Sequence, residues 1–330
     1  MLKVGIVGTG TMGRTHAAAY TKLPNAQLVG FYDADQAFAG RVAPQFGAKV
    51  FESYDALLQQ VDMVDLCTPT PTHLDLVLKA VSAGKHILCE KPLGRTLEQC
   101  EQMIEATSKA GVTLMPAQVL RFFPEFKQAR DLVLAGAVGK PAAIRTRRGG
   151  PYPRAVNDWY ADFEQSGGPI LDMVIHDFDW LRWTFGEVER VFAKALTFKK
   201  LDHIDYALIT LRLKSGAIAH VEANWADPGG FKVDFEIAGD AGMIAFDSRL
   251  AMPLTVAKQD AGGGGGGVAV PESPLAEDPY TLEIQHFVDS VLAGQKPSIS
   301  AEDGMKAVEI ALAAIESART GKVIRLGGGA

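Results

Sequence analysis

The sequence has few cysteines and no long hydrophobic run. Its three cysteines, in 330 residues, match neither a zinc motif nor a disulfide framework, and such usage is typical of a reducing compartment. No apolar run reaches the roughly 18 residues of a membrane span, and the first residues lack the basic flank and cleavage site of a signal peptide. We therefore expect a cytoplasmic protein without a membrane span or a metal.

Basic residues do not outnumber acidic ones. The chain carries 33 Lys and Arg against 39 Asp and Glu, which gives a formal net charge of −6 at pH 7. A nucleic-acid partner requires a basic face to meet its phosphates, so DNA and RNA binding are not expected. Apolar residues make up 47% of the chain, as in folded globular proteins, and its length favours two domains.

The first 120 residues alternate short apolar runs with helical stretches. This alternation predicts crossover connections and a doubly wound parallel sheet with helices on both faces. We assign residues 1–120 to this first α/β domain. Strands are expected at residues 4–7, 28–32, 49–51, 63–66, 86–89 and 112–116, and helices at 12–23, 34–46, 53–59, 72–83 and 96–110.

The second half has a different pattern. Apolar and polar residues alternate in several runs, as at Val233, Phe235 and Ile237, which indicates an antiparallel sheet with one solvent-facing side. We assign residues 121–330 to an α+β domain with a large, mostly antiparallel, open-faced sheet, although its last two helices can pack on either domain. The glycine run 262–267 predicts a mobile surface loop. Strands are expected at residues 142–146, 188–197, 206–213, 217–225, 233–237, 243–246 and 323–326, and helices at 170–185, 280–293 and 301–320.

Three glycines follow the first predicted strand and open the next helix. Gly8, Gly10 and Gly13 form a G-x-G-x-x-G motif. The first allows a tight turn, the second lets the backbone approach a pyrophosphate, and the third lets helix and strand pack closely. Because the motif begins a run of crossover units, it predicts a Rossmann dinucleotide site rather than a glycine-rich turn without a ligand.

An acidic residue stands where the cofactor ribose is expected. Asp33 follows the second predicted strand, and a carboxylate there accepts hydrogen bonds from both ribose hydroxyls and repels a 2′-phosphate. The sequence thus predicts NAD rather than NADP, unless Asp33 or Asp35 serves only as a helix cap. Residues 67–73, rich in Thr and Pro, follow the fourth strand; we expect them to face the dinucleotide and to form a stiff turn with Thr72 as a helix cap.

A lysine, an aspartate and a histidine are further candidate functional residues. Lys91 follows the fifth predicted strand, and the spacing of Asp172 and His176 places two side chains on one face of a helix, which Asp179 shares. Alone, such a lysine is ordinarily a solvated charge, and such an Asp-x-x-x-His pair is a surface salt bridge or a structural histidine. Their combination with a dinucleotide loop favours a catalytic role.

The chain resembles the Gfo/Idh/MocA family (glucose–fructose oxidoreductase, inositol dehydrogenase and rhizopine catabolism) over essentially its whole length. The similarity rests on GTGTMGRTH, which ends at His16, on residues 68–96 with their GKH turn and EKP, on residues 121–141, on SGGPILDMVIHDFD from residue 166, and on the segment from Pro279. Two departures are visible: Pro169 replaces a frequent third glycine, and the glycine run has no expected counterpart.

The resemblance implies an NAD-dependent dehydrogenase for a secondary alcohol of a cyclitol or sugar, with Lys91, Asp172 and His176 as the catalytic set. Lys91 or His176 transfers the hydroxyl proton, the ammonium stabilises the alkoxide, and Asp172 orients the histidine or holds a hydroxyl. An aromatic residue such as Trp225 is more typical of a core. The expected substrate contacts are Arg121, Asn157, Trp159, Asp172 and His176. The expected cofactor contacts are Gly8, Thr9, Gly10, Thr11, Met12, Gly13, Asp33, Thr68, Pro69, Thr70, His73, Glu90 and Lys91.

Other interpretations stay open from the sequence. The same residues can oxidise a glycoside transiently, so that it is eliminated or epimerised without net redox change. A non-catalytic sensor could bind the dinucleotide and a partner protein, although it would not need Lys91, Asp172 and His176 together. A purely structural oligomer module would leave the glycine loop unexplained. The resemblance also implies a homodimer or homotetramer formed through the exposed face of the C-terminal sheet.

Overall fold

The computed structural model describes residues 1–197, 205–250 and 278–327, and the chain divides into two compact units. The first unit comprises Met1–Phe122 and Glu277–Val308, and the second comprises Phe123–Ala276 and Glu309–Ala330. The chain thus leaves the first unit, builds most of the second, and later returns to the first. The glycine run predicted to be a mobile loop, at residues 262–267, lies outside the described residues.

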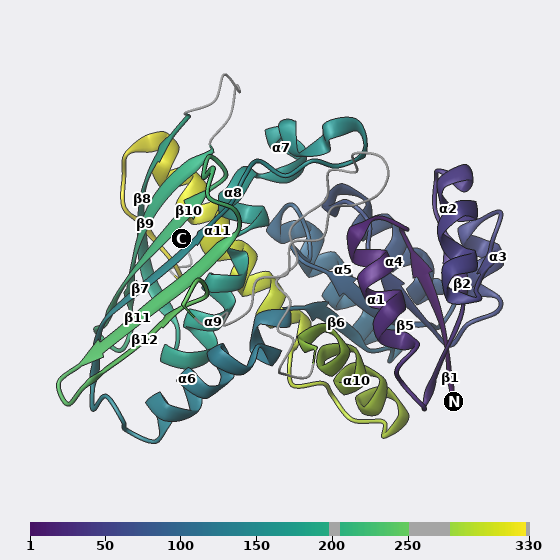
Figure 1. Cartoon of the computed structure of the whole chain (residues 1–330), viewed down its shortest axis with the longest axis horizontal. Helices are drawn as coiled ribbons and strands as arrows, with labels where there is room; N and C mark the ends of the chain where they lie inside the picture. The colour runs from purple at the N-terminus through teal and green to yellow at the C-terminus, as the bar shows by residue number, and fades with distance from the viewer. Residues whose placement is uncertain (198–204, 251–277, 328–330) are drawn as a thin grey trace. The chain divides into compact units, whose positions relative to one another are not determined.

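A six-stranded parallel sheet organises the first unit. Its strands are β1 (Leu2–Val7), β2 (Ala26–Tyr32), β3 (Lys49–Val50), β4 (Met63–Leu66), β5 (His86–Glu90) and β6 (Leu114–Ala117). They follow the order β3-β2-β1-β4-β5-β6, so the chain starts in the middle and winds outward in both directions. Figure 1 labels β1, β2, β5 and β6 of this sheet. Strand β4 is buried at every residue, as expected where both faces of a sheet are covered. The predicted doubly wound Rossmann sheet is confirmed.

Helices connect these strands. They are α1 (Thr11–Tyr20), α2 (Gln36–Val42), α3 (Tyr54–Leu58), α4 (His73–Ser82) and α5 (Leu97–Ala110). The hydroxyls of Ser53 and Thr96 accept hydrogen bonds from the N–H groups of Ala56 and Gln99, and so cap α3 and α5 as their sequences indicate. Within the described ranges, no helix combines the length and the apolar character needed to span a bilayer.

Helix α10 (Pro279–Leu292) brings a late part of the chain into the core of the first unit. Ile284, Phe287 and Val288 from this helix are buried in one cluster with Ile6 of β1 and Tyr20 of α1. The first strand and the first helix of the chain therefore depend on α10 for part of their packing. Helix α11 (Ala301–Thr320) begins in this unit and ends in the second.

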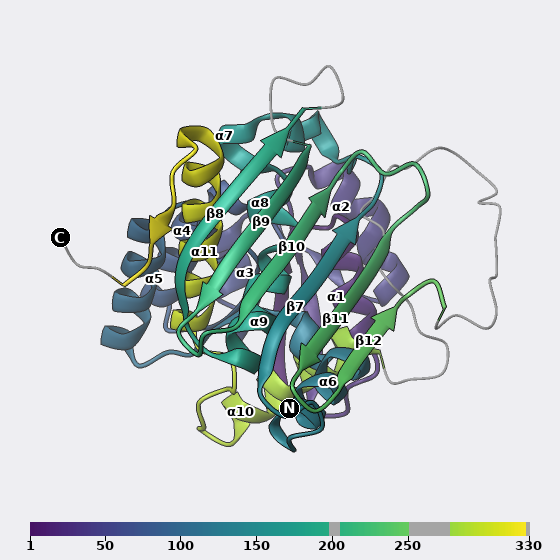
Figure 2. The ribbon, with the colours of Figure 1, turned by 90° about the vertical axis from the view of Figure 1, so that its left-hand side faces the viewer.

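The second unit contains a seven-stranded sheet. Its strands are β7 (Pro141–Gly149), β8 (Val188–Leu196), β9 (Tyr206–Leu213), β10 (Ile218–Asn224), β11 (Lys232–Gly239), β12 (Met243–Asp247) and β13 (Ile324–Arg325). The order is β12-β11-β7-β10-β9-β8-β13, and all neighbours are antiparallel except β7 and β10. Every second residue of β9 and β10 is buried, which confirms the predicted mostly antiparallel sheet. Figure 2 shows this sheet face on.

Four helices of the second unit lie behind that face of the sheet. They are α6 (Pro124–Leu134), α7 (Phe163–Ser166), α8 (Gly168–Asp172) and α9 (Ile175–Phe185). Trp180 of α9 is fully buried, and its ring centroid lies 5.2 Å from that of Phe126 in α6 and 5.1 Å from that of Phe235 in β11. These aromatic contacts hold α6 and α9 on one side of the sheet (Figure 2).

The single helix predicted over residues 170–185 is wrong, because the structure has two helices there. The N–H groups of Met173 and Val174 both donate to the carbonyl oxygen of Pro169, at 3.2 and 3.0 Å. The regular hydrogen-bond ladder therefore ends after α8, and α9 begins anew. Asp172 and His176 do not lie on one continuous helix, so their spacing in the sequence does not define their relative positions.

We predict that Phe287→Ala lowers the free energy of unfolding by about 3–5 kcal/mol, because it leaves a cavity in the core of the first unit. Leu292→Ala on the same helix is the matched control. Leu292 is 50% exposed, so its truncation should change stability by no more than about 0.5 kcal/mol. Urea unfolding followed by circular dichroism measures both variants. Equal losses would show that the buried face of α10 does not contribute to this core.

Candidate active site

Four adjacent strands of the first sheet end at the same edge. Strands β2, β1, β4 and β5 are parallel neighbours, and their last residues are close to level in the strand register. The loops that follow them carry Gly8, Asp33, Thr68 and Lys91. Ligands of open parallel sheets bind outside this edge. The fold therefore brings together the loops that the sequence analysis assigned to the cofactor.

The glycine loop is shaped by two close backbone approaches. Gly8 has φ +95°, and a Cβ there would lie 2.6 Å from the carbonyl oxygen of Cys67. A Cβ on Gly13 would lie 1.9 Å from the carbonyl oxygen of Gly8, so neither position accepts a larger residue without a shift of the backbone. A Cβ on Gly10 would meet no atom within 4 Å. The loop is thus closed at Gly8 and Gly13 and open at Gly10.

The N-terminus of α1 lies at this open position. Gly10 is its N-cap residue, no side chain caps the helix, and its first turn contains no acidic residue. Thr11 and Met12, the first helical residues, are half-buried. Uncapped N–H groups at the positive end of a helix favour an anion, and the glycine leaves room for it to approach. The loop therefore fits the pyrophosphate of a dinucleotide.

Asp33 is held in place by three hydrogen bonds. Its Oδ2 accepts from the N–H of Thr9 at 2.7 Å and from the hydroxyl of Thr9 at 2.6 Å, and its Oδ1 accepts from the N–H of Asp35 at 2.9 Å. The helix cap that the sequence left open falls to Asp35, which accepts from the N–H of Phe38 and so starts α2. Asp33 itself joins the glycine loop to the end of β2, where a ribose is expected.

The Thr-Pro segment after β4 forms a 3-10 turn, Thr70–Thr72, that leads into α4. Thr72 is the N-cap residue of this helix, as expected, but its side chain does not cap the helix N–H groups. Its hydroxyl lies 2.8 Å from the carbonyl oxygen of Pro69 and 2.7 Å from the hydroxyl of Thr68, and it makes no capping hydrogen bond. Thr70 is buried, whereas Thr68 and Pro69 retain exposed surface at the sheet edge.

His73, expected to contact the cofactor, is fully buried and connects two loops. Its Nδ1 lies 3.0 Å from the carbonyl oxygen of Pro92, and its Nε2 lies 2.9 Å from that of Thr68. Burial lowers the pKa of His73. The ring therefore ties the loop after β4 to the loop that follows Lys91, and a direct contact with the cofactor stays a prediction.

Lys91 follows β5 directly and is half-buried at the sheet edge. The preceding residue, Glu90, is only 6% exposed. The backbone N–H of Lys91 donates to Oε2 of Glu90 at 3.0 Å. The lysine predicted to be catalytic is thus joined to a buried carboxylate through its own main chain.

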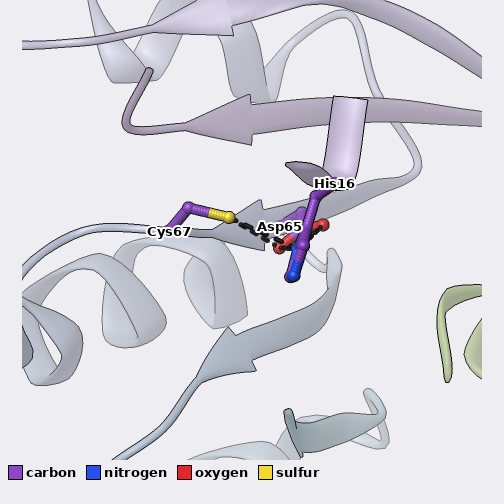
Figure 3. Close-up of side chains that lie close together, drawn as sticks. All are labelled: His16, Asp65 and Cys67. Carbon is purple, nitrogen blue, oxygen red and sulfur yellow. Dashed lines mark hydrogen bonds and ion pairs between the residues drawn. The ribbon is translucent and has the colours of Figure 1, made fainter. Parts of the chain in front are cut away.

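Glu90 also meets a buried histidine from the first helix. The Nε2 of His16 lies 3.3 Å from Oε1 of Glu90, and its Nδ1 lies 2.9 Å from Oδ2 of Asp65. The hydroxyl of Tyr20 donates to the same Asp65 oxygen at 3.0 Å. His16 and Asp65 are fully buried, and Figure 3 shows the two side chains close together. The sequence analysis included His16 in a family motif but gave it no role.

The electrostatics of this cluster favour a protonated His16. Burial is the largest single effect and lowers the pKa of His16, but the charges and hydrogen bonds of Asp65 and Cys67 together outweigh it, and the pKa lies well above its usual value. Burial raises the pKa of Glu90, but the contacts with His16 and the charge of Lys91 outweigh it and lower the pKa. Both shifts favour an imidazolium beside the Glu90 carboxylate.

His16, Asp65 and Cys67 offer potential metal ligands within 4.8 Å of one another (Figure 3). The atoms are already engaged, however, because the thiol of Cys67 donates to Oδ1 of Asp65 at 3.3 Å and the imidazole faces the same carboxylate. Burial raises the pKa of Cys67, whereas a metal needs a thiolate. These residues fit a hydrogen-bonded cluster better than a coordination shell.

In the second unit, Asp172 and His176 lie on either side of the break between α8 and α9. Asp172 is buried at the end of α8, and His176 is half-buried in the first turn of α9. The adjacent Asp177 is fully buried and pairs with Arg148 of β7, with Nε and Oδ2 2.7 Å apart. This ion pair fixes the first turn of α9, and hence the backbone that carries His176, to the sheet.

Arg121, predicted to contact the substrate, is buried within the first unit. Its guanidinium lies 3.3 Å from Oδ2 of Asp303 at the start of α11 and 3.4 Å from the carbonyl oxygen of Ser298. It therefore holds the returning segment of the chain against the end of the first sheet. A further contact with a substrate stays a prediction.

The other predicted substrate residues lie near an aromatic group in the second unit. Trp159 is half-buried and stacks on Tyr160, with ring centroids 4.2 Å apart. Tyr160 also contacts Trp225, which is 3% exposed and so belongs to the core, as its sequence position favoured. Asn157 lies in the adjoining 3-10 turn, Val156–Ala161.

A doubly wound sheet with an open glycine loop, an uncapped helix N-terminus and a fixed carboxylate after β2 defines a dinucleotide-binding protein of the Rossmann class. Comparison with known proteins narrows the class. Residues 2–118 match the model of the oxidoreductase family with an NAD-binding Rossmann fold, and residues 126–245 match the Gfo/Idh/MocA C-terminal domain. The chain belongs to the Gfo/Idh/MocA family of oxidoreductases.

Several relatives cover nearly the whole chain. Myo-inositol 2-dehydrogenase of Thermotoga maritima is 31% identical over 98% of this chain and 98% of its own length. Scyllo-inositol dehydrogenase of Lactobacillus casei, solved with NAD(H) and scyllo-inositol, has a TM-score of 0.85 at 27% identity and covers 99% of this chain and 100% of that one. GenD2 from gentamicin A biosynthesis, solved with NAD, has a TM-score of 0.90 at 27% identity and covers 99% of this chain and 97% of that one. The predicted oxidoreductase class and the NAD cofactor are confirmed.

We predict that the protein binds NADH at least about tenfold more tightly than NADPH, and that Asp33→Ala weakens NADH binding by about 10- to 100-fold and reduces this preference. The carboxylate would otherwise accept ribose hydrogen bonds, and charged hydrogen bonds of this kind contribute about 1.5–3 kcal/mol. Titration followed by coenzyme fluorescence measures the dissociation constants of NADH and NADPH without a substrate.

Asp35→Ala is the matched control for this experiment. It removes the cap of α2 and costs about 1 kcal/mol of stability, but it leaves the preference for NADH unchanged. Equal binding of NADPH and NADH by the unaltered protein would contradict the role assigned to Asp33.

Proposed function

We propose that the protein is an NAD-dependent inositol dehydrogenase, which transfers hydride between nicotinamide and a secondary alcohol of a cyclitol. Support comes from the full-length similarity to a myo-inositol 2-dehydrogenase and to a scyllo-inositol dehydrogenase solved with both NAD(H) and its cyclitol. The dinucleotide edge of the first sheet supplies the cofactor site on which this chemistry depends. A secondary alcohol of a sugar belongs to the same proposed substrate class.

The proposed mechanism assigns one task to each of three side chains. NAD, when bound, accepts the hydride from the substrate carbon. His176 takes the hydroxyl proton, since imidazole ordinarily titrates near neutral pH, and Asp172 orients the histidine or holds a neighbouring hydroxyl. Lys91 donates a hydrogen bond to the reacting oxygen and stabilises its developing negative charge. This assignment requires Lys91 of the first unit and His176 of the second to act on one substrate.

We predict that Lys91→Met and His176→Ala each lower kcat for cyclitol oxidation by about 10²- to 10⁴-fold, because each removes a group that acts on the proton or on the alkoxide. The assay follows NADH absorbance with myo-inositol, scyllo-inositol, glucose and galactose. Lys109→Met is a matched control, because this lysine is exposed on α5 and pairs with Glu105 of the same helix. It should retain full activity.

Three outcomes of this assay would contradict the proposal in different ways. Near-normal turnover by both Lys91→Met and His176→Ala would remove the catalytic assignment. Conversion of a glycoside without accumulation of NADH would replace net oxidation by transient oxidation. A protein that binds NADH but converts none of the cyclitols or sugars tested would favour a sensor.

We further propose that the protein works in the cytoplasm as a homodimer or homotetramer formed through the solvent-facing side of the second sheet. Cys67, Cys89 and Cys100 are all free thiols, which suits a reducing compartment. Leu208 and Ile218 are 50% and 37% exposed on this side, next to polar residues. Sedimentation velocity should show an oligomer that Leu208→Asp weakens, and a monomer at micromolar concentration would contradict this proposal.

A further inference from the structure

The carboxylate of Glu90 is held at both oxygens. Oε2 accepts the backbone N–H of Lys91 at 3.0 Å, and Oε1 lies 3.3 Å from Nε2 of His16. Glu90 is the last residue of β5, and His16 belongs to α1, the helix that begins at the glycine loop. The cofactor helix thus reaches, through one buried side chain, the strand end that carries Lys91.

The surroundings of His16 require a cation. Its Nδ1 faces Asp65 and its Nε2 faces Glu90, so each ring nitrogen meets a carboxylate oxygen. A neutral imidazole carries one N–H and one lone pair, and the lone pair would then face one of the two carboxylates. A protonated ring places an N–H on each side: Nδ1 is hydrogen-bonded to Asp65, and Nε2 faces Glu90 at ion-pair distance without a well-directed hydrogen bond. The ring is fully buried, so water does not substitute for either partner.

Other ionisable groups surround this contact from three further directions. Tyr20 of α1 and Cys67 after β4 both donate to Asp65. The ring centroid of Tyr280 of α10 lies 6.2 Å from that of His16. Glu283 of the same helix is buried, and its charge raises the pKa of Tyr20, with a smaller effect than burial, Asp65 and Cys67. The groups added by these directions are neutral or negative. Among the described residues, His16 is the buried group that pairs with Glu90, and the charge of Lys91 also acts on this carboxylate.

A second buried histidine fixes the chain after Lys91. Nδ1 of His73 lies 3.0 Å from the carbonyl oxygen of Pro92 and 3.3 Å from that of Leu93. The backbone on each side of Lys91 is thus tied to a histidine that does not contact solvent. His73 acts on main-chain oxygens, whereas His16 acts through the charge of Glu90.

We propose that His16 is a positioning residue for Lys91: as a buried imidazolium it holds the Glu90 carboxylate, and the carboxylate in turn fixes the peptide that carries the catalytic ammonium. This inference rests on the proposed function. Without the cation, two buried carboxylates would be left close together, and Glu90 would move or take up a proton. Lys91 would then lose its fixed main-chain partner, and misplacement by about 1 Å at a reacting group can lower the rate about 100-fold.

The protonation state of His16 is tested by nitrogen NMR of the full-length protein labelled with ¹⁵N-histidine. We expect one histidine to have both ring nitrogens protonated at pH 7 and 8, because a raised pKa keeps the cation until the pH rises through it. The signal is assigned as the one that is lost in His16→Gln. If that variant does not fold, the signal that shifts in both Tyr20→Phe and Glu90→Gln identifies it. A neutral ring at pH 7 would overturn the proposal.

The positioning role is tested by kinetics of His16→Gln, Glu90→Gln and the double variant. We expect His16→Gln to lower kcat by about 10- to 100-fold while KM for NAD changes by less than about threefold. In the Glu90→Gln background the same change should cost no more than about threefold, because the carboxylate that His16 holds is already gone. Tyr20→Phe is the matched control: it removes a hydrogen bond to the same Asp65 without removing the cation, and kcat should not change.

The outcomes separate this inference from the proposed function. If His16→Gln lowers kcat equally with and without the Glu90 carboxylate, or if kcat stays normal while Lys91→Met is inactive, the positioning role is wrong and the dehydrogenase proposal stands. If Lys91→Met retains turnover, the proposed catalytic set fails first. The NMR result then still decides whether His16 is a buried cation.

Discussion

All six strands of the first sheet run in the same direction, so the loops after β1, β2, β4 and β5 must emerge at one edge. Main-chain hydrogen bonds join these loops: the N–H of Gly8 donates to the carbonyl oxygen of Tyr32, and the N–H of Cys67 donates to that of Val7. The backbone therefore brings the glycine loop, Asp33 and Lys91 to one edge before any side-chain contact contributes. An antiparallel strand among them would send one of these groups to the opposite edge.

Beneath this edge the protein buries several charges, and burial of a charge is costly unless it is paired. Asp65 and Glu90 are paired with His16, and in the second unit Asp177 is paired with Arg148. Ion pairs of this kind contribute little net stability compared with apolar packing, but the loss of one partner leaves the other unsatisfied. Their effect is to allow only one arrangement of the groups beside them. In both units, such a pair adjoins a residue of the proposed catalytic set.

Much of the fold could be predicted because its signals are local. The G-x-G-x-x-G spacing and the alternation in β9 and β10 each report on residues close in the sequence, and both predictions agree with the structure. The helix break at Met173 and Val174 could not be predicted, because it depends on which amide groups reach the carbonyl oxygen of Pro169. A single helix satisfies the same sequence pattern.

The candidate site was predictable only in part, for a related reason. Asp33 and Lys91 follow predicted strands, so their common edge could be inferred from the topology. The roles of His16 and Arg121 depend on partners far away in the sequence: Asp65 lies 49 residues from His16, and Asp303 lies 182 residues from Arg121. Nothing local marks such pairs, and only the packed structure shows them. The catalytic and substrate roles themselves remain predictions.

The path of the chain between its two units limits how such proteins can be recombined. The first unit is completed by residues up to Val308, and α11 continues without interruption into the second. The second unit therefore cannot be exchanged between relatives by one cut after residue 122. It needs three junctions, and one of them falls inside a continuous helix, where donor and acceptor sequences must agree in helical phase. A recombinant that ignores this junction would separate α10 from the first unit, which would then lose part of its hydrophobic core.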